Sequence, residues 1–206
     1  MSTRIIHNGS KEAPNIFLLA HGAGAGIHTD FMTSIAEQCA GPDIEVIRFE
    51  FPYMTLQRDT GKKKAPNPQK TLLQSFLTEV TQQRSARLYI GGKSMGGRIA
   101  SMIADATKVS GLICLGYPFH PPGNADKLRI DHLKALQTRT LILQGERDPF
   151  GNLDEVKTYP LSSQITLQWI PDGEHSFKPR KSSGTTQAAN LKLAAEQIRQ
   201  FILHRP

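Results

Sequence analysis

Five consecutive residues, Gly92-Lys93-Ser94-Met95-Gly96, fit two different kinds of chemistry. Gly-Lys-Ser ends a phosphate-binding loop, whereas two glycines spaced around a serine form the G-x-S-x-G turn that exposes a nucleophilic serine. A phosphate-binding loop needs a further glycine five positions before Gly92, and that position is Arg87. The spacing therefore favours a serine nucleophile over a nucleotide site.

The residues on either side of Ser94 read as a strand, a sharp turn and a helix. Residues 87–91 have the character of a short buried strand, and residues 95–107 repeat apolar side chains at helical spacing. Glycine is expected at positions 92 and 96 because a Cβ on either neighbour would collide with the adjacent strand or helix. Taken alone, the motif is equally consistent with a small residue in a glycine-rich turn.

Strand-like and helical patterns alternate along nearly the whole chain, which predicts an α/β fold with a mostly parallel sheet between two layers of helices. We expect one domain over residues 1–206, a sheet of about six to seven strands and no large lid. Residues 1–14 leave room for one short strand, and residues 117–136 for a short helix at most. Strands are predicted at 15–20, 45–51, 87–91, 111–115, 140–144 and 166–170, and helices at 30–39, 70–83, 95–107 and 188–204.

Partners for a nucleophilic Ser94 should lie in loops at the carboxyl ends of later strands, where open α/β sheets bind ligands. Asp148 follows the strand 140–144, and His175 follows the strand that ends at Ile170. Singly, each has an ordinary explanation as a turn or loop residue. Together they give the chain order serine, acid, histidine that is typical of α/β-hydrolases, with Glu146 as the reserve candidate for the acid.

The glycine-rich loop after the first long strand, residues 21–26, could supply a backbone N–H to an oxyanion hole. We expect Ala23 to donate it, together with the N–H of Met95. A dinucleotide-binding G-x-G-x-x-G motif would need glycine where Ile27 stands, so that alternative is weak.

Composition sets the remaining limits. The 206 residues contain no apolar stretch near the roughly 20 residues of a membrane span, and the start lacks the apolar core of a signal peptide, so we expect a cytoplasmic location without membrane partners. Cys39 and Cys114 are expected as reduced core thiols, and no cysteine–histidine cluster has metal-binding spacing. The net charge of +7 includes basic clusters at 62–64 and 178–181, which lack interleaved aromatic residues and are expected as solvated loops. Nucleic acid is therefore not the expected partner.

Several segments of the chain resemble a small α/β-hydrolase family. The family includes bacterial single-domain proteins, a testis-expressed vertebrate protein and a domain of a subunit of the nonspecific-lethal chromatin complex, and it is more distantly similar to dienelactone hydrolases. The resemblance covers about residues 14–204 and implies the same fold, the Ser94, Asp148 and His175 set, and no cofactor. The segments that carry it are His21–Gly26, Gly92–Arg98, Leu115–Gly123, Gln144–Pro149 and Asp172–Phe177.

These residues predict a serine hydrolase that cleaves an ester or related acyl bond of a small or medium substrate. The sequence leaves open esterase, thioesterase or peptidase chemistry, and it leaves open the oligomeric state. The alternative from another class is a noncatalytic module of the same fold that binds an acidic partner or nucleic acid.

Substrate contacts are expected from residues near the nucleophile and at the strand ends, with Phe51, Pro52 and Tyr53 on the other flank. Lys93 and the basic loop at 62–64 could favour an anionic substrate, although Lys93 could equally pack its stem and point to solvent. The expected contact residues are His21, Gly22, Lys93, Tyr117, Phe119 and His120.

Overall fold

A seven-stranded sheet organises the residues described by the computed structural model, which are 4–84 and 87–204. The strand order is β1-β3-β2-β4-β5-β6-β7, and every neighbouring pair is parallel except β1 with β3. The expected fold class is therefore confirmed. The strands are β1 (Ile5–Asn8), β2 (Asn15–Ala20), β3 (Ile44–Phe49), β4 (Arg87–Lys93), β5 (Gly111–Leu115), β6 (Thr140–Gly145) and β7 (Ile165–Ile170).

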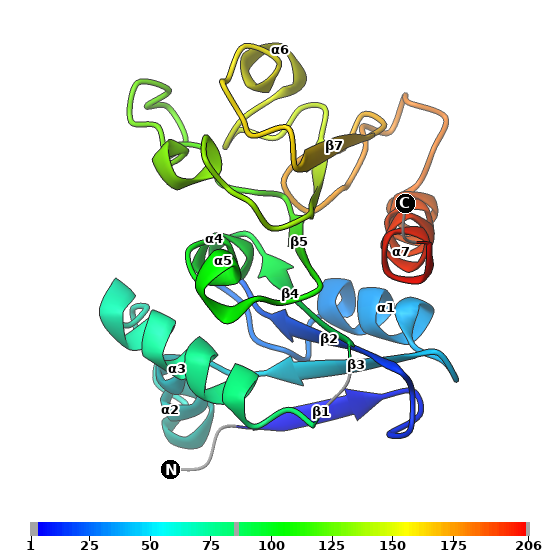
Figure 1. Ribbon diagram of the computed structural model, residues 1–206. Coiled ribbons are helices and arrows are strands. Elements are labelled where there is room, and N and C mark those ends of the chain that lie inside the picture. The colour runs from blue at the N-terminus through cyan, green and yellow to red at the C-terminus, as the bar shows by residue number, and fades with distance from the viewer. Residues whose placement is uncertain (1–3, 85–86, 205–206) are drawn as a thin grey trace.

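Helices cover both faces of the sheet (Figure 1). One face carries α1 (Asp30–Cys39) and α7 (Gln187–Leu203), which pack against each other. The other face carries α2 (Pro52–Thr60), α3 (Gln69–Thr81), α4 (Met95–Ser101) and α5 (Ala104–Thr107). The short α6 (Leu153–Val156) and a single 3₁₀ turn, η1 (Asp131–Leu133), lie in the connections beside β6 and β7.

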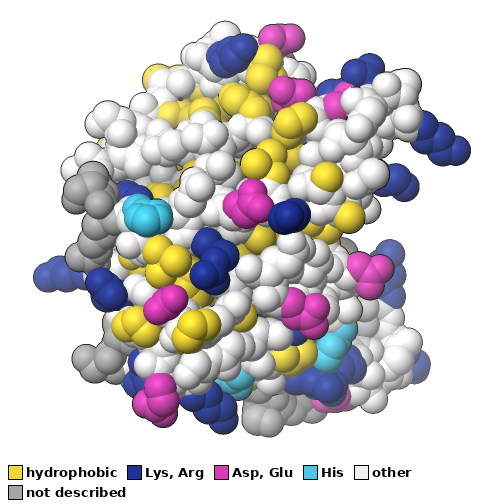
Figure 2. Space-filling model, turned by 90° about the vertical axis from the view of Figure 1, so that its right-hand side faces the viewer, with side chains coloured by type: hydrophobic (Ala, Val, Ile, Leu, Met, Phe, Trp, Pro, Cys, Tyr) yellow, Lys and Arg dark blue, Asp and Glu magenta, His cyan; other side chains and the backbone are white. Residues whose placement is uncertain are grey.

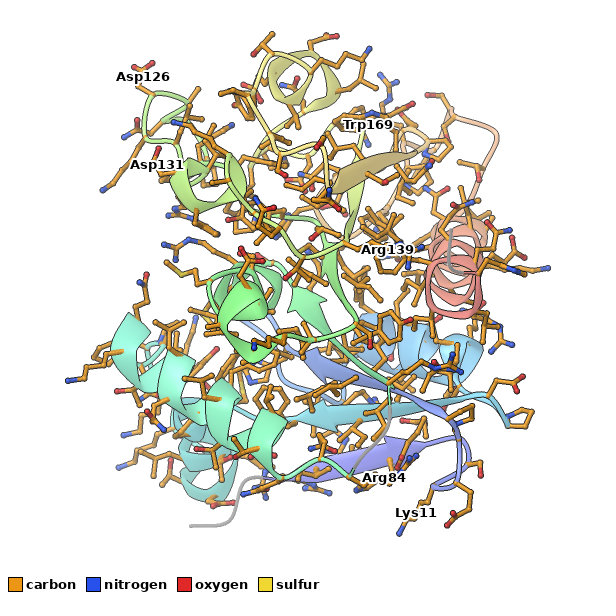
Figure 3. The ribbon with its side chains drawn as sticks, viewed as in Figure 1. Lys11, Arg84, Asp126, Asp131, Arg139 and Trp169 are labelled. Atoms are coloured by element: carbon orange, nitrogen blue, oxygen red, sulfur yellow. The ribbon has the colours of Figure 1, made fainter. Side chains whose placement is uncertain are left out.

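Two apolar cores fill the spaces between the sheet and its helices. Strand residues alternate between them: Ile90 points to the core under α3 and α4, whereas Tyr89 points to the core under α1 and α7. β2 through β6 are buried over most of their length, as expected for parallel strands covered on both faces. Arg139 joins the C-terminal helix to the sheet, because its guanidinium donates to the Phe201 carbonyl at 2.8 Å and lies over the Phe201 ring (Figure 3).

Most predicted strands and helices agree with the structure within two residues; the differences that bear on the site are at β4, over residues 95–107 and at α2, and the short α6 was also not predicted. β4 runs to Lys93 rather than ending at Gly91, because Lys93 still pairs with Leu115. The helix expected over residues 95–107 is two helices, since Met102 and Ile103 donate to carbonyls three residues back and tighten the chain there. Helix α2 was not predicted, although Pro52 occupies its first turn, a position where proline is favoured.

The surface expectations are confirmed as far as the structure describes them. The loops at 62–64 and 178–181 lie outside helices and strands, and most of their residues are exposed. On the face that carries α1 and α7, Lys and Arg side chains are scattered among acidic and neutral ones rather than gathered into one patch (Figure 2). Cys39 and Cys114 are buried free thiols, and burial raises the pKa of Cys39 to about 12. None of the helices in the described part of the chain is both long enough and apolar enough to cross a bilayer.

Candidate active site

Ser94 occupies a sharp turn between β4 and α4. Its backbone has φ 52° and ψ −116°, a conformation that residues with a Cβ seldom adopt. The Ser94 N–H donates to the Leu115 carbonyl at 2.9 Å, and the Ser94 carbonyl accepts from the Arg98 N–H at 3.0 Å. These two bonds tie the turn to the neighbouring strand and to the start of α4, so the expected strand, turn and helix are all present.

The glycines on either side of Ser94 allow this turn to lie close to β2. A Cβ on Gly92 would come within 2.5 Å of the Ala20 carbonyl oxygen, and a Cβ on Gly96 within 2.6 Å of the same atom. Real Cβ atoms do not approach backbone that closely, so both positions require glycine, as the sequence predicted.

A chain of hydrogen bonds joins Ser94 to two residues that lie far from it in the sequence. His175 Nε2 lies 2.9 Å from Ser94 Oγ, and His175 Nδ1 lies 2.8 Å from Asp148 Oδ2. Asp148 follows β6 and His175 follows β7, so all three residues are at the carboxyl edge of the sheet. The structure therefore brings together the three residues that the sequence singled out.

Asp148 is held in place by bonds that leave one oxygen for His175. The carboxyl group is completely buried, and its Oδ1 accepts from the Phe150 N–H at 2.9 Å. The Phe150 ring lies against the imidazole of His175, with ring centroids 4.2 Å apart. Glu146, the reserve candidate for the acid, instead accepts from the Asp172 N–H at 2.7 Å.

The loop after β2 lies opposite Ser94 and is fixed from behind by α2. Tyr53 Oη donates to the Ala23 carbonyl at 2.9 Å and reaches the Gly22 carbonyl at 3.2 Å. Since these carbonyls are bonded toward Tyr53, the loop is held in one orientation. Met95, the other expected N–H donor, is the first residue of α4, where backbone N–H groups have no partner within the helix.

A cavity of about 420 Å³ opens beside Ser94. Its walls are mostly apolar, which suits the carbon skeleton of a small or medium substrate. Two of the lining side chains, Phe31 and Met32, come from the first turn of α1. The lining residues are Gly22, Ala23, Gly24, Ala25, Thr29, Phe31, Met32, Lys93, Ser94, Phe150, His175 and Ser176.

Lys93 is buried at the inner wall of this cavity. Its Nζ lies 5.5 Å from the centre of the Phe31 ring, and its stem lies next to Gly22. Burial lowers the pKa of the ammonium to about 8, although the nearby carboxylates of Asp148 and Glu174 oppose that shift. The alternative that Lys93 points to solvent is therefore wrong.

Four of the residues expected to contact substrate do not line the cavity. His21 is buried, and its Nε2 accepts from the Phe51 N–H at 3.0 Å, so it supports the loop from below. Burial also lowers the pKa of His21, which favours the neutral ring that this bond requires. The other three, Tyr117, Phe119 and His120, are buried where the chain leaves β5.

The segment after β5 turns inward because its polar groups find partners inside the protein. Tyr117 Oη donates to the Arg129 carbonyl at 2.9 Å, His120 Nε2 lies 3.3 Å from Glu155 Oε2, and Phe119 packs on Tyr117 and Tyr159. Gly22 and Lys93 are the two expected contact residues that do line the cavity.

The sequence did not predict the cavity wall formed by α1 and by the loops that carry Asp148 and His175. Thr29 and Ser176 contribute hydroxyls, and Phe31, Met32 and Phe150 contribute apolar surface. The position of Phe150, two residues after Asp148, could have been used to predict that Phe150 lines the cavity. Nothing in the pattern of α1 distinguishes Phe31 from a core residue of an amphipathic helix.

Comparison with known proteins agrees with this geometry. Residues 13–203 match the family model described as an alpha/beta hydrolase domain. The chain belongs to this α/β hydrolase family.

Solved structures of the same fold cover nearly the whole chain. An α/β serine hydrolase without a lid from Xanthomonas campestris is 18% identical with a TM-score of 0.68, and the match covers 99% of this chain and 91% of that one. A dienelactone hydrolase from Anabaena variabilis is also 18% identical, with a TM-score of 0.71 over 97% and 92% of the two chains. Est1E from Butyrivibrio proteoclasticus, bound to ferulic acid, is 17% identical with a TM-score of 0.66 over 98% and 94%. At these identities the matches establish a shared fold, and the connection between β5 and β6 likewise carries no lid, only the η1 turn.

Proposed function

We propose that this α/β hydrolase family member is a serine hydrolase that cleaves an ester or related acyl bond of a small or medium substrate. The observation that carries the proposal is the hydrogen-bonded chain from Asp148 through His175 to Ser94 at the mouth of a cavity. No cofactor is required for this chemistry.

In the proposed reaction, Ser94 Oγ attacks the carbonyl carbon while His175 Nε2 takes the hydroxyl proton. His175 then gives that proton to the leaving group, and an acyl group remains on Ser94. A water molecule repeats the attack with His175 as base, which releases the acid and restores the serine. Asp148 accepts from Nδ1, which keeps Nε2 free to take the proton, and stabilises the imidazolium that forms.

We assign the oxyanion hole to the N–H groups of Ala23 and Met95. Ala23 lines the cavity next to Ser94, and the helix that starts at Met95 directs its positive end toward the reacting carbonyl. The two bonds from Tyr53 support this role, because they hold the Ala23 loop before substrate arrives.

The comparisons support the reaction class by analogy. Structures of the same fold include a serine hydrolase and a dienelactone hydrolase, and one that binds ferulic acid. We also propose that the chain forms one domain and that it acts in the cytoplasm. Its proposed substrate is a small molecule rather than nucleic acid. Within the α/β hydrolases, we propose that it groups with the testis-expressed and nonspecific-lethal complex proteins that its motifs resemble. A carboxylesterase is the activity to test first.

The deciding experiment is intact-mass analysis after incubation with a fluorophosphonate. We expect one adduct per wild-type chain and no adduct on Ser94→Ala. Ser101→Ala is a matched control, because Ser101 lies in α4, the helix that follows Ser94, but its hydroxyl bonds to the Arg98 carbonyl and His132 rather than to His175. A folded wild-type protein that forms no adduct would overturn the proposal and favour the noncatalytic interaction module.

A further inference from the structure

Lys93 has an unusual environment for a charged side chain. Only 8% of the residue is exposed, yet within residues 4–84 and 87–204 its ammonium has no hydrogen-bond partner. A buried cation without a hydrogen-bonded counterion is unfavourable unless another interaction compensates for its lost hydration. An anionic ligand that enters the cavity would supply such a partner.

The nearest carboxylates are already bonded elsewhere. Asp148 accepts from His175 and from the Phe150 N–H, and Glu174 Oε1 accepts from the N–H groups of Ser176 and Lys178. Both carboxylates favour the charged form of Lys93 electrostatically. Neither, however, occupies the three donor positions of the ammonium.

The cavity itself has the charge pattern of an anion site. Of its described lining residues none is acidic, and Lys93 is the one lysine or arginine among them. Phe31, whose ring centre is 5.5 Å from the ammonium, lines the cavity, and the Lys93 stem lies against Gly22 on the cavity wall, while Nζ itself lies beside Gly116 and the His175 backbone. Rotation of the flexible four-carbon stem would bring the ammonium from beside Gly116 to a ligand in the cavity.

We propose, on the basis of the serine hydrolase function above, that the substrate carries a free carboxylate that pairs with Lys93 while Ser94 attacks its ester. A charge-assisted hydrogen bond inside an apolar cavity gives the selectivity, because the same bond in water would be exchanged for solvent. Lys93 then serves as a specificity-determining residue, and the bond cleaved is still the ester at Ser94.

The test compares two esters that differ in charge. The mono-para-nitrophenyl ester of adipate has a free carboxylate on its acyl chain, and para-nitrophenyl heptanoate is the neutral ester of similar length. We expect wild-type kcat/KM to be about 10- to 100-fold higher for the charged ester, and the ratio to fall toward one in Lys93→Met, which keeps the stem without the charge. The meta-carboxyphenyl ester of heptanoate places the carboxylate on the leaving group instead, so it shows which side of the substrate the site reads.

A matched control separates the buried cation from general positive charge. Lys181 is exposed in the loop that follows the histidine, so Lys181→Met should leave the charged-to-neutral ratio unchanged. Raising the salt concentration should also affect the ratio little if a buried pair forms it. If Lys181→Met lowers the ratio as much as Lys93→Met does, surface steering explains the selectivity and the proposal is wrong.

The remaining outcomes also decide the question. If the wild-type ratio of charged-ester to neutral-ester kcat/KM is near one for every charged ester, the anion site is overturned and the hydrolase function stands. The same conclusion follows if Lys93→Met loses activity equally on the charged and the neutral ester. If Lys93→Met does not fold, Lys93→Gln replaces it. If Ser94 reacts with fluorophosphonate but the protein hydrolyses none of these esters, we instead compare how well adipate and heptanamide slow the labelling of Ser94 by fluorophosphonate. If no adduct forms at all, the proposed function fails first.

Discussion

The acid of the proposed triad is best tested by an isosteric change. Asp148→Asn keeps the shape of a completely buried side chain but reverses the hydrogen bond to His175 Nδ1, so His175 would hold its proton on the wrong nitrogen. We expect kcat to fall about ten-thousand-fold, by analogy with other serine hydrolases, while circular dichroism stays unchanged. Glu146→Gln is the control, since Glu146 lies two residues away and bonds to Asp172 instead. Equal losses in the two variants would argue against the assignment.

The pH dependence of selectivity is a second prediction at the residue scale. The pKa of Lys93 is lowered to about 8, so the ammonium is charged below that pH and neutral above it. The charged-to-neutral ratio of kcat/KM should therefore be highest near neutral pH and decline as the pH rises through about 8. Taking a ratio cancels any effect of pH that is common to both esters, including effects through the groups that face Lys93, which are His175, Asp148 and Glu174. A ratio that stays constant across this range would contradict the role given to Lys93.

At the scale of elements, the contact between α2 and the loop after β2 is the feature that sequence reasoning missed and that the site depends on. Tyr53→Phe removes the hydroxyl that holds the Gly22 and Ala23 carbonyls. We expect a loss of about 1 kcal/mol in the free energy of unfolding and a fall of about tenfold in kcat, because the oxyanion donor is less well held.

The control for this variant is a tyrosine with a comparable bond far from the site. Tyr89 Oη donates to the Ile202 carbonyl at 3.1 Å under α7. Tyr89→Phe should cost a similar amount of stability and leave kcat unchanged. If the two variants have the same activity, Tyr53 has only a structural role.

The close approach of α4 to β2 gives another prediction at this scale. Gly96→Ala would place a Cβ within 2.6 Å of two backbone oxygens, so we expect a loss of about 3 kcal/mol in the free energy of unfolding, measured by denaturant titration. Gly24→Ala is the comparison, because its Cβ would meet nothing within 4 Å and should change stability by less than about 0.5 kcal/mol.

Local patterns were enough to predict most elements and the three residues of the proposed triad. Parallel strands buried on both faces appear as short apolar runs, and loops at one sheet edge follow from the strand directions alone. The cavity wall could not be predicted in the same way. Phe31 lies on α1, which packs against α7, and Tyr117 turns inward, where the Arg129 carbonyl accepts its hydroxyl. Such contacts join segments that are far apart in the sequence, so local patterns do not predict them.

At the scale of the whole molecule, the distribution of charge matters more than the net charge of +7. The two basic clusters, residues 62–64 and 178–181, lie in separate loops, and Arg180 is already paired with Asp172 at 2.6 Å. A nucleic-acid surface requires several cations that follow the phosphate spacing. We therefore expect no retention on a random DNA duplex column at about 50 mM salt. Retention that falls steeply with salt would instead support the interaction module.

The strained backbone of Ser94 leads to a prediction about the stability of the whole molecule. Its φ of 52° is strained for serine and relaxed for glycine, so the residue that suits this turn best is not the one that occupies it. We expect Ser94→Gly to exceed Ser94→Ala by about 1 kcal/mol in free energy of unfolding, with neither variant able to form the adduct. A side chain at position 94 therefore costs backbone strain that glycine would avoid, and calorimetry of the two variants can measure that strain without knowledge of any substrate.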